Sequence, residues 1–253
     1  MLQSLSLAQF WIPLLQIIGV NIVLSGDNAV VIALACRSLA PSQQKKGIIF
    51  GSAGAIVLRI LLTFFAASLL TIAYLKLAGA ALLVWIGIKL LISDEGDDDG
   101  TGIKSHEELY AAIRTVIIAD VVMSLDNVIG VAAAAKGSFL LMVLGLLISI
   151  PLIVFGSTFI MRLMDRFPVI ITAGGALLGY VSGEMAVTDV GVLAWAEREV
   201  PLVHQWLPIA LALLVVLIGS WLNRRAQARA RAAGEVLIDL TDPQASPRSG
   251  SGD

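Results

Sequence analysis

The sequence predicts an all-α membrane protein with seven transmembrane helices, arranged as an inverted 3+3 repeat plus one extra helix. Of its 253 residues, 58% are hydrophobic and 14% are charged, whereas soluble domains carry roughly 25% charged residues. The mean hydropathy is +0.90. These values exclude a soluble cytosolic enzyme and a disordered chain. The net charge of −2 gives no sign of a nucleic-acid partner.

Seven apolar stretches approach the length of about 20 residues that a helix needs to cross a bilayer. They cover residues 8–36, 47–73, 75–93, 111–135, 139–163, 169–187 and 206–222. We assign three to a first unit (8–93), three to a second (111–188) and one to a seventh helix (206–224). An acidic cytoplasmic loop (94–110) joins the units, and the segment 232–253, rich in Pro, Ser and Gly, is expected to be a disordered cytoplasmic tail.

Lysine and arginine residues predict the orientation, because cytoplasmic loops carry an excess of them. One set of connections holds ten: Arg37, Lys45, Lys46, Lys104, Arg162, Arg166, Arg224, Arg225, Arg229 and Arg231. The other set holds three: Lys76, Lys136 and Arg198. We therefore expect a multi-pass protein of the cell (inner) membrane, with its N-terminus outside and its C-terminus in the cytoplasm.

A polar motif occurs twice in the chain. The stretch Asn21-Ile-Val-Leu-Ser25-Gly-Asp27-Asn28 returns 99 positions later as Asp120-Val-Val-Met-Ser124-Leu-Asp126-Asn127. A second stretch, Ala-Gly-Ala-Ala-Leu-Leu from position 78, returns 95 positions later as Ala-Gly-Gly-Ala-Leu-Leu. Because each unit has three passes, the second unit must enter from the opposite side. Inverted repeats of this kind are typical of secondary transporters, whose sites lie near the bilayer midplane.

Ionisable residues inside the predicted helices indicate a cation site. The acids are Asp27, Asp120, Asp126 and Glu184, and Arg59 is the deep cation. Fully ionised, they leave three negative charges, and such a surplus attracts cations or protons. The seven stretches contain oxygen ligands but no histidine, which favours hard cations such as Mg²⁺, Ca²⁺ or Mn²⁺ over zinc or copper.

Most polar residues of each motif share one helical face. Their spacing of i, i+4 and i+7 groups Asn21, Ser25 and Asn28 in the first copy and Asp120, Ser124 and Asn127 in the second. On an ideal helix Asp27 and Asp126 lie about 120° from that face. Either the helix breaks beside them, which Gly26 would permit in the first copy, or these aspartates line an adjoining seam.

Simpler interpretations compete at several positions. Asn21, Ser25 and Ser124 could be hydrogen-bonding residues between helices. Arg59 fits a counter-ion to an aspartate as well as a gate, and Glu184 could be a residue that reaches the outer interface. Glycines are expected to permit close helix packing at Gly79, Gly87, Gly174, Gly175, Gly179 and Gly183.

At these residues the chain resembles the TerC family of integral membrane proteins, in particular its short YjbE-like branch, within the LysE-type transporter superfamily. The two Ser-x-Asp-Asn motifs and Gly183-Glu184-Met185 carry the resemblance, which covers about residues 8–225. It implies a divalent-metal transporter, most often a manganese exporter, in which the paired Asp-Asn residues bind the metal.

We therefore expect efflux of Mn²⁺ by alternating access at a midplane site. The expected metal ligands are Asp27, Asn28, Asp126, Asn127, Asn21 and Asp120, supported by Ser25, Ser124, Glu184 and Arg59. Mn²⁺ is the substrate and no cofactor is expected. The expected partners are the metal ion and the lipid bilayer. No nucleic-acid partner is expected, and the sequence leaves it open whether the protein forms a homo-oligomer.

Other functions use the same features. One is export of a small organic cation or amino acid, which would need a roomier and more aromatic site. Another is a membrane accessory protein that delivers metal to exported proteins. A membrane enzyme could use paired aspartates for acid–base chemistry. However, each aspartate here has an adjacent asparagine in a duplicated motif, which indicates coordination, so no enzymatic activity is expected.

Overall fold

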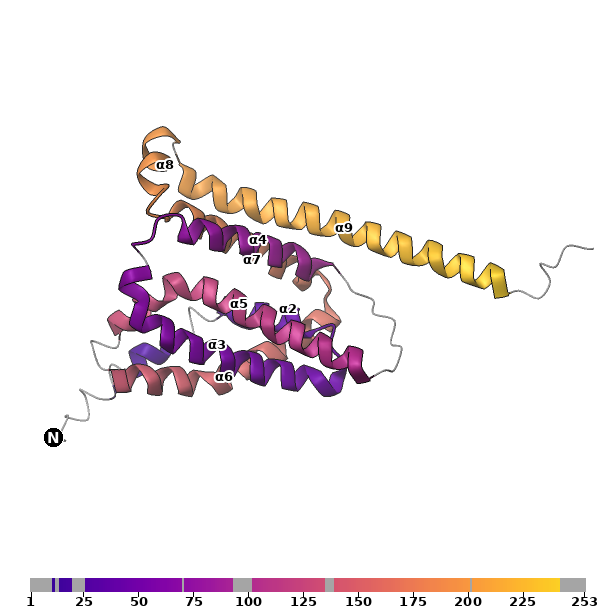
Figure 1. Ribbon diagram of the computed structural model, residues 1–253, viewed down its shortest axis with the longest axis horizontal. Helices are drawn as coiled ribbons and strands as arrows, with labels where there is room; N and C mark the ends of the chain where they lie inside the picture. The colour runs from indigo at the N-terminus through magenta and orange to yellow at the C-terminus, as the bar shows by residue number, and fades with distance from the viewer. Residues whose placement is uncertain are drawn as a thin grey trace, which may run out of the picture.

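A computed structural model describes residues 11, 14–19, 26–69, 71–92, 102–134, 139–200 and 202–241 (Figure 1). Every regular element in these ranges is an α-helix. In chain order the helices are α2 (Gly26–Cys36), α3 (Pro41–Leu69), α4 (Leu75–Leu91), α5 (Gly102–Ala134), α6 (Phe139–Arg166), α7 (Val169–Val187), α8 (Leu193–Glu199) and α9 (Val203–Thr241).

Four helical stretches within the described ranges are long and apolar enough to cross a membrane. They are Pro41–Phe65, Val143–Arg166, Val169–Val187 and Val203–Arg229. This result confirms a helical membrane protein. The helices α2, α4 and α5 overlap the other three predicted stretches, α2 as a shorter apolar helix. The count of seven spans and the inverted repeat stay predictions.

Two helices extend beyond their predicted limits. α5 begins at Gly102, within the segment 94–110 that we expected to be a loop. α9 continues to Thr241, ten residues past Arg231 and into the expected tail. Half of the added residues, 232–241, are Ala, Leu or Glu, which have high helix propensity. Residues 93–101 and 242–253 lie outside the described ranges.

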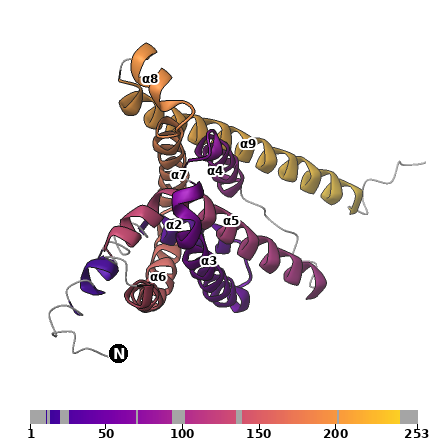
Figure 2. The ribbon, with the colours of Figure 1, turned by 60° about the vertical axis from the view of Figure 1, so that its left-hand side comes forward.

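The long helices form two groups (Figures 1 and 2). α2, α3, α5 and α6 pack together in a four-helix group, and α4, α7 and α9 form a three-helix group. The groups meet where α4 contacts α5 and where α7 contacts α2 and α6. Each predicted unit is therefore divided: its first two helices lie in the four-helix group and its third lies in the other.

Close contacts at glycines give the relative directions of neighbouring helices. A Cβ atom at Gly47 or Gly51 of α3 would meet Leu109 or Val116 of α5, respectively, so α3 and α5 run parallel. α7 and α9 run antiparallel, because Gly179 lies against Leu211 and Ala212 whereas Gly183 lies against Pro208. These directions agree with the predicted alternation of the passes.

The six glycines that we expected at helix seams all lie in close helix contacts. A Cβ atom at any of them would crowd a neighbouring helix. At Gly179 and Gly183 the obstacle is the backbone of α9, which cannot move aside as a side chain can. The prediction of close packing is confirmed, and it explains how α7 and α9 approach each other so closely.

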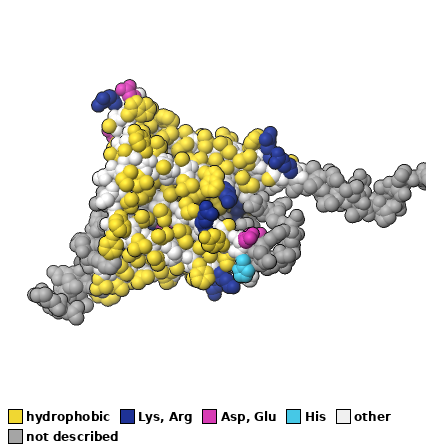
Figure 3. Space-filling model, in the orientation of Figure 1, with side chains coloured by type: hydrophobic (Ala, Val, Ile, Leu, Met, Phe, Trp, Pro, Cys, Tyr) yellow, Lys and Arg dark blue, Asp and Glu magenta, His cyan; other side chains and the backbone are white. Residues whose placement is uncertain are grey.

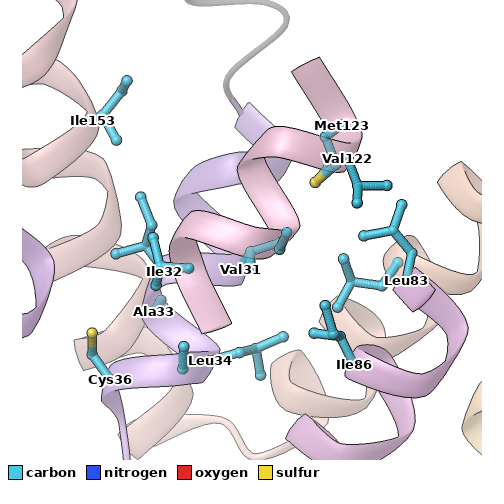
Figure 4. Packing of buried hydrophobic residues seen from close by; sticks show 14 of the residues in the cluster. Val31, Ile32, Ala33, Leu34, Cys36, Leu83, Ile86, Val122, Met123 and Ile153 are labelled. Atoms are coloured by element: carbon cyan, nitrogen blue, oxygen red, sulfur yellow. The ribbon is translucent and has the colours of Figure 1, made fainter. Parts of the chain in front are cut away.

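Buried apolar side chains concentrate around α2 (Figure 4). Val31 and Leu34 of α2 lie toward Leu83 and Ile86 of α4, with Met123 of α5 nearby. The outward faces are apolar too, and Figure 3 shows hydrophobic side chains over most of the visible face. Phe155 of α6, for example, is 81% exposed. A surface of this kind suits lipid tails rather than water.

Two tryptophans lie beneath cationic side chains on α4 and α9. The Lys89 ammonium lies 5.5 Å from the centre of the Trp85 ring, and the Arg225 guanidinium lies 3.9 Å from that of Trp221. Both tryptophans are exposed. Cation–π pairs of this kind are common at the membrane–water boundary, where Trp anchors helices and long cationic side chains reach the headgroups.

Candidate metal site and its buried ion pair

A buried ion pair joins α3 to α5. Arg59 of α3 and Asp120 of α5 are 1% and 6% exposed, and Arg59 Nη2 pairs directly with Asp120 Oδ1. Arg59 Nε also donates a hydrogen bond to Ser124 Oγ at 3.1 Å, and Ser124 Oγ donates to Asp120 Oδ2 at 3.2 Å. Ser124 lies one helical turn after Asp120, which brings both to the same guanidinium. Arg59 is therefore a counter-ion, one of its two predicted roles.

Arg59 keeps a fixed positive charge inside the protein, and Asp120 neutralises it. An arginine side chain stays protonated in proteins, and the low dielectric of the interior makes a buried charge expensive unless it is paired. Removing one partner of such a pair typically destabilises a protein by about 3–5 kcal/mol. The carboxylate of Asp120, which we expected among the metal ligands, is thus already engaged by Arg59.

Asp27 lies on α2, which contacts both helices of this pair. It occupies the first turn of α2, directly after Gly26, and its Oδ1 accepts a hydrogen bond of 2.7 Å from the backbone N–H of Asn28. Its side chain lies close enough to interact electrostatically with both Arg59 and Asp120. The neighbouring Asn28 is buried. The structure therefore brings together an aspartate from each copy of the motif.

Several predicted site residues cannot be placed beside this cluster. Asn21 and Ser25 lie outside the described residues, and so does the side chain of Asp126. The backbone of α5 continues as a regular helix through Asp126, so no helix break occurs in the second copy. Asn127 follows on the same helix and is half-buried.

The described side chains do not form a ready metal site made of acids, histidines and cysteines alone. Among them, no group of three or more such residues is placed to hold a metal ion. The predicted ligand set is of another kind, because it includes the amide oxygens of Asn28 and Asn127 and the carboxylate of Asp126. That set stays a prediction.

Glu184 lies at the surface instead of in the cluster. It is exposed and lines a surface hollow of about 340 Å³ with Lys76, Val187, Thr188 and His204. Glu184 is thus exposed near the C-terminal end of α7, as the simpler interpretation of a residue that reaches the outer interface requires.

The residues beside Glu184 have packing roles. Gly183 lies against Pro208 of α9, and Met185 reaches Gly79 of α4. Val122, which lies between Asp120 and Ser124 in α5, contacts the same glycine. The segment around Met185 therefore lies at the level of the ion pair and connects the two helix groups there.

A further buried carboxylate, which sequence reasoning missed, holds the start of α4. Asp189 follows α7 and is fully buried. Its Oδ1 accepts hydrogen bonds from the backbone N–H groups of Tyr74 (2.8 Å) and Gly191 (2.7 Å). Its Oδ2 accepts from Lys76 (3.0 Å) and Leu77 (3.2 Å). Asp189 thus caps α4 from a distant part of the chain, because the first N–H groups of a helix lack partners within it.

Electrostatics at Asp189 agree with this role. Burial acts to raise the pKa of its carboxyl group, but the four backbone N–H donors outweigh burial and lower the pKa below its ordinary value. The sequence Asp189-x-Gly191 is a turn signal, since an aspartate often accepts a bond from the backbone two residues on. This local sequence gives no sign that the carboxylate of Asp189 also binds the start of α4.

Comparisons with known proteins show the family of the chain. The family model described as "Integral membrane protein TerC family" matches residues 6–228. The chain is 43% identical over 208 residues to the uncharacterized membrane protein YjbE of Bacillus subtilis, covering 82% of this chain and 94% of that protein.

More distant relatives are also membrane proteins. The chain is 25% identical to the uncharacterized membrane protein YceF of Bacillus subtilis, covering 83% of this chain and 82% of YceF. It is 25% identical to the UPF0053 inner membrane protein YgdQ of Escherichia coli K12, covering 62% of this chain and 73% of YgdQ. No solved structure matches the chain.

Proposed function

The chain belongs to the TerC family of integral membrane proteins, and we propose that it exports divalent metal ions, with Mn²⁺ as the substrate, by alternating access. The observation that carries the proposal is that Asp27, half-buried on α2, lies within electrostatic range of the buried Arg59–Asp120 pair, on helices that contact one another. Acidic groups from the two copies of the motif come together there, where a cation is the natural partner of any carboxylate left unneutralised.

The charge of the cluster supports a divalent substrate. The exposed position of Glu184 removes it from the count of buried acids. Of the four acids that the sequence places inside predicted helices, Asp27, Asp120 and Asp126 remain, opposed by Arg59. When these three acids and Arg59 are ionised, two negative charges are left over, which one divalent cation neutralises. This balance differs from the three charges that the sequence alone led us to expect.

The ligand chemistry favours a hard ion. In the proposed site Asp27, Asn28, Asp126 and Asn127 supply carboxylate and amide oxygens, with Asn21 and the serines nearby. Mn²⁺, Mg²⁺ and Ca²⁺ all prefer such oxygens. Choosing Mn²⁺ among them rests on the family resemblance alone. Protons are the natural coupling ion, because carboxylates can take up protons when the metal leaves.

The packing of the helices supports two related units. If the units are exchanged, the contact of α3 with α5 becomes that of α6 with α2, and the contact of α4 with α5 becomes that of α7 with α2. Each of these pairs is in contact. In our proposal an inverted repeat underlies this pattern, and the cytoplasmic side is the one that holds the C-terminal end of α9.

Metal flux through the purified protein tests the proposal. Proteoliposomes with wild-type protein should accumulate Mn²⁺, and Asp27→Asn and Asp126→Asn should each abolish the flux while still inserting. Asp165→Asn is the matched control, because Asp165 is an exposed acid near the end of α6. Running Mg²⁺, Ca²⁺ and lysine in parallel distinguishes metal export from export of an organic cation. Normal Mn²⁺ flux by both site variants would refute the site.

A further inference from the structure

We propose that Arg59 sets the charge of the metal site, and that Asp120 serves as the partner of this arginine rather than as a metal ligand. Arg59 thereby makes the site specific for a divalent cation. This inference deepens the proposed function and rests on it. It assigns Arg59 and Asp120 as specificity-determining residues that act through charge.

Both oxygens of Asp120 are already used. Oδ1 pairs with Arg59 Nη2, and Oδ2 accepts the hydroxyl of Ser124 at 3.2 Å. The same hydroxyl accepts a hydrogen bond of 3.1 Å from Arg59 Nε, so the three side chains form a closed ring of interactions. A metal ion could reach Asp120 only by displacing a guanidinium and a hydroxyl together. The Oδ1 atom of Asp27 instead accepts a hydrogen bond from the backbone of its own helix, and Asp27 interacts with Arg59 and Asp120 electrostatically.

The two copies of the repeat differ at these positions in a correlated way. The counterpart of Asp120 is Asn21, which carries no charge. The offsets of 99 and 95 place the counterpart of Arg59 at Thr158 or Val154 of α6, neither of which carries a charge. Arginine and aspartate are therefore both present in one of the two equivalent pairings and both absent from the other. This difference fits a pair that is kept or lost together as a charge-balanced unit.

The charge has a direct consequence for binding. A guanidinium cannot lose its proton to make room for a second positive charge, so an unneutralised Arg59 would repel an incoming metal ion. Asp120 neutralises Arg59, so the pair carries no net charge. The two remaining carboxylates, Asp27 and Asp126, then carry the charge that one divalent ion balances. In the protein interior a single added charge a few ångströms away changes binding strongly.

Four purified proteins test this assignment: wild type, Asp120→Asn, Arg59→Met and the double variant. We measure the Kd for Mn²⁺ by calorimetry and Mn²⁺ flux in proteoliposomes. Asp120→Asn should raise the Kd at least about tenfold, because it leaves Arg59 unneutralised. Arg59→Met should lower the Kd and slow release, because it leaves an extra negative charge. The double variant should return to within about threefold of the wild-type Kd, because the charge of the site is restored.

Two controls accompany these variants. Arg162→Met removes an exposed arginine near the end of α6 and should leave Kd and flux unchanged. Arg59→Lys keeps the positive charge but loses the forked geometry, and it should bind Mn²⁺ within about threefold of wild type. This variant keeps the proposal testable even if the neutral variants fail to insert.

The outcomes separate the possible errors. A double variant that inserts but binds as weakly as Asp120→Asn would overturn the inference, because it would make Asp120 a direct ligand. Weak binding by an inserted Arg59→Lys variant would also overturn it, since geometry rather than charge would then matter. Absence of Mn²⁺ binding and flux in the wild type would refute the proposed function itself, whereas wild-type flux with an inactive double variant would refute only the role of the pair.

Discussion

Replacing Asp189 by asparagine should destabilise the protein by removing the cap of α4. An amide keeps one acceptor oxygen, so its NH₂ group must face two backbone donors, either those of Tyr74 and Gly191 or those of Lys76 and Leu77. A buried N–H without an acceptor costs about 1–3 kcal/mol. Two such groups predict a loss of about 2–6 kcal/mol, and at roughly 2–4 °C per kcal/mol for a chain of this size the Tm should fall by at least about 4 °C.

The pH dependence gives this prediction a second, independent signature. The pKa of Asp189 is lower in the folded protein than its ordinary value near 4. A group whose pKa is lowered by folding contributes stability above its unfolded pKa, and that contribution is lost as the pH falls through the folded value. The wild type should therefore lose stability below about pH 4 more steeply than Asp189→Asn, so the difference in Tm should narrow.

Thermal unfolding of the detergent-purified protein, followed between pH 7 and pH 3, measures both effects. Asp165→Asn serves as the control, because it removes an exposed carboxylate and should leave the Tm within about 1 °C of wild type. An Asp189→Asn protein with the wild-type Tm at pH 7 would refute the capping argument. A large Tm difference that stays constant down to pH 3 would refute the assignment of the effect to the charged carboxylate.

Three further predictions follow from the packing and the charges. Gly183→Ala should lower the yield of monodisperse protein in size-exclusion chromatography, because the added Cβ would meet the backbone at Pro208. Gly156→Ala is the control, since a Cβ there makes only ordinary contacts. Equal yields of the two variants would contradict the argument. Cys36 is fully buried, so a maleimide should label it only after denaturation, and rapid labelling of the folded protein would contradict its placement. A fluorescent protein fused after residue 253 should fluoresce in cells, because the basic residues near the end of α9 predict a cytoplasmic C-terminus; activity of a periplasmic reporter there would reverse the orientation.

Features that repeat along the chain were predictable from the sequence. Apolar stretches located the helices because lipid selects for length and hydropathy alone. The glycines in helix seams were predictable because few other residues let backbones approach so closely. For Arg59, charge alone left a counter-ion and a gate as equal possibilities, and the ion pair with Asp120 decided in favour of the counter-ion. Length, hydropathy and residue size can all be read from a short stretch of sequence without knowing which helices meet.

Features that depend on which helices meet were not predictable. The carboxylate of Asp189 acts on residues more than 100 positions earlier in the chain, and local sequence gives no sign of such a partner. The partner of Asp120 was not predictable either, because charge alone does not say whether its carboxylate binds a metal ion or Arg59. Glu184 looked like a member of the site because it falls inside an apolar stretch, but the side of α7 on which it lies is exposed.

The division of the helices changes how alternating access should be pictured. In inverted-repeat transporters alternating access is often a rocking of one unit against the other, yet α3 packs on α5 and α4 packs on α7, so the two predicted units are interleaved. A movement of one whole unit would separate both of those pairs. A movement of the three-helix group against the four-helix group would preserve them and would break the main contacts between the groups in the described ranges, which are those of α4 with α5 and of α7 with α2 and α6. The Asp189 cap lies inside the three-helix group and would keep α4 fixed to α7 throughout. The Arg59–Asp120 pair lies inside the four-helix group, as does Asp27, so the proposed site would travel with that group while α4 and α7 open and close beside it.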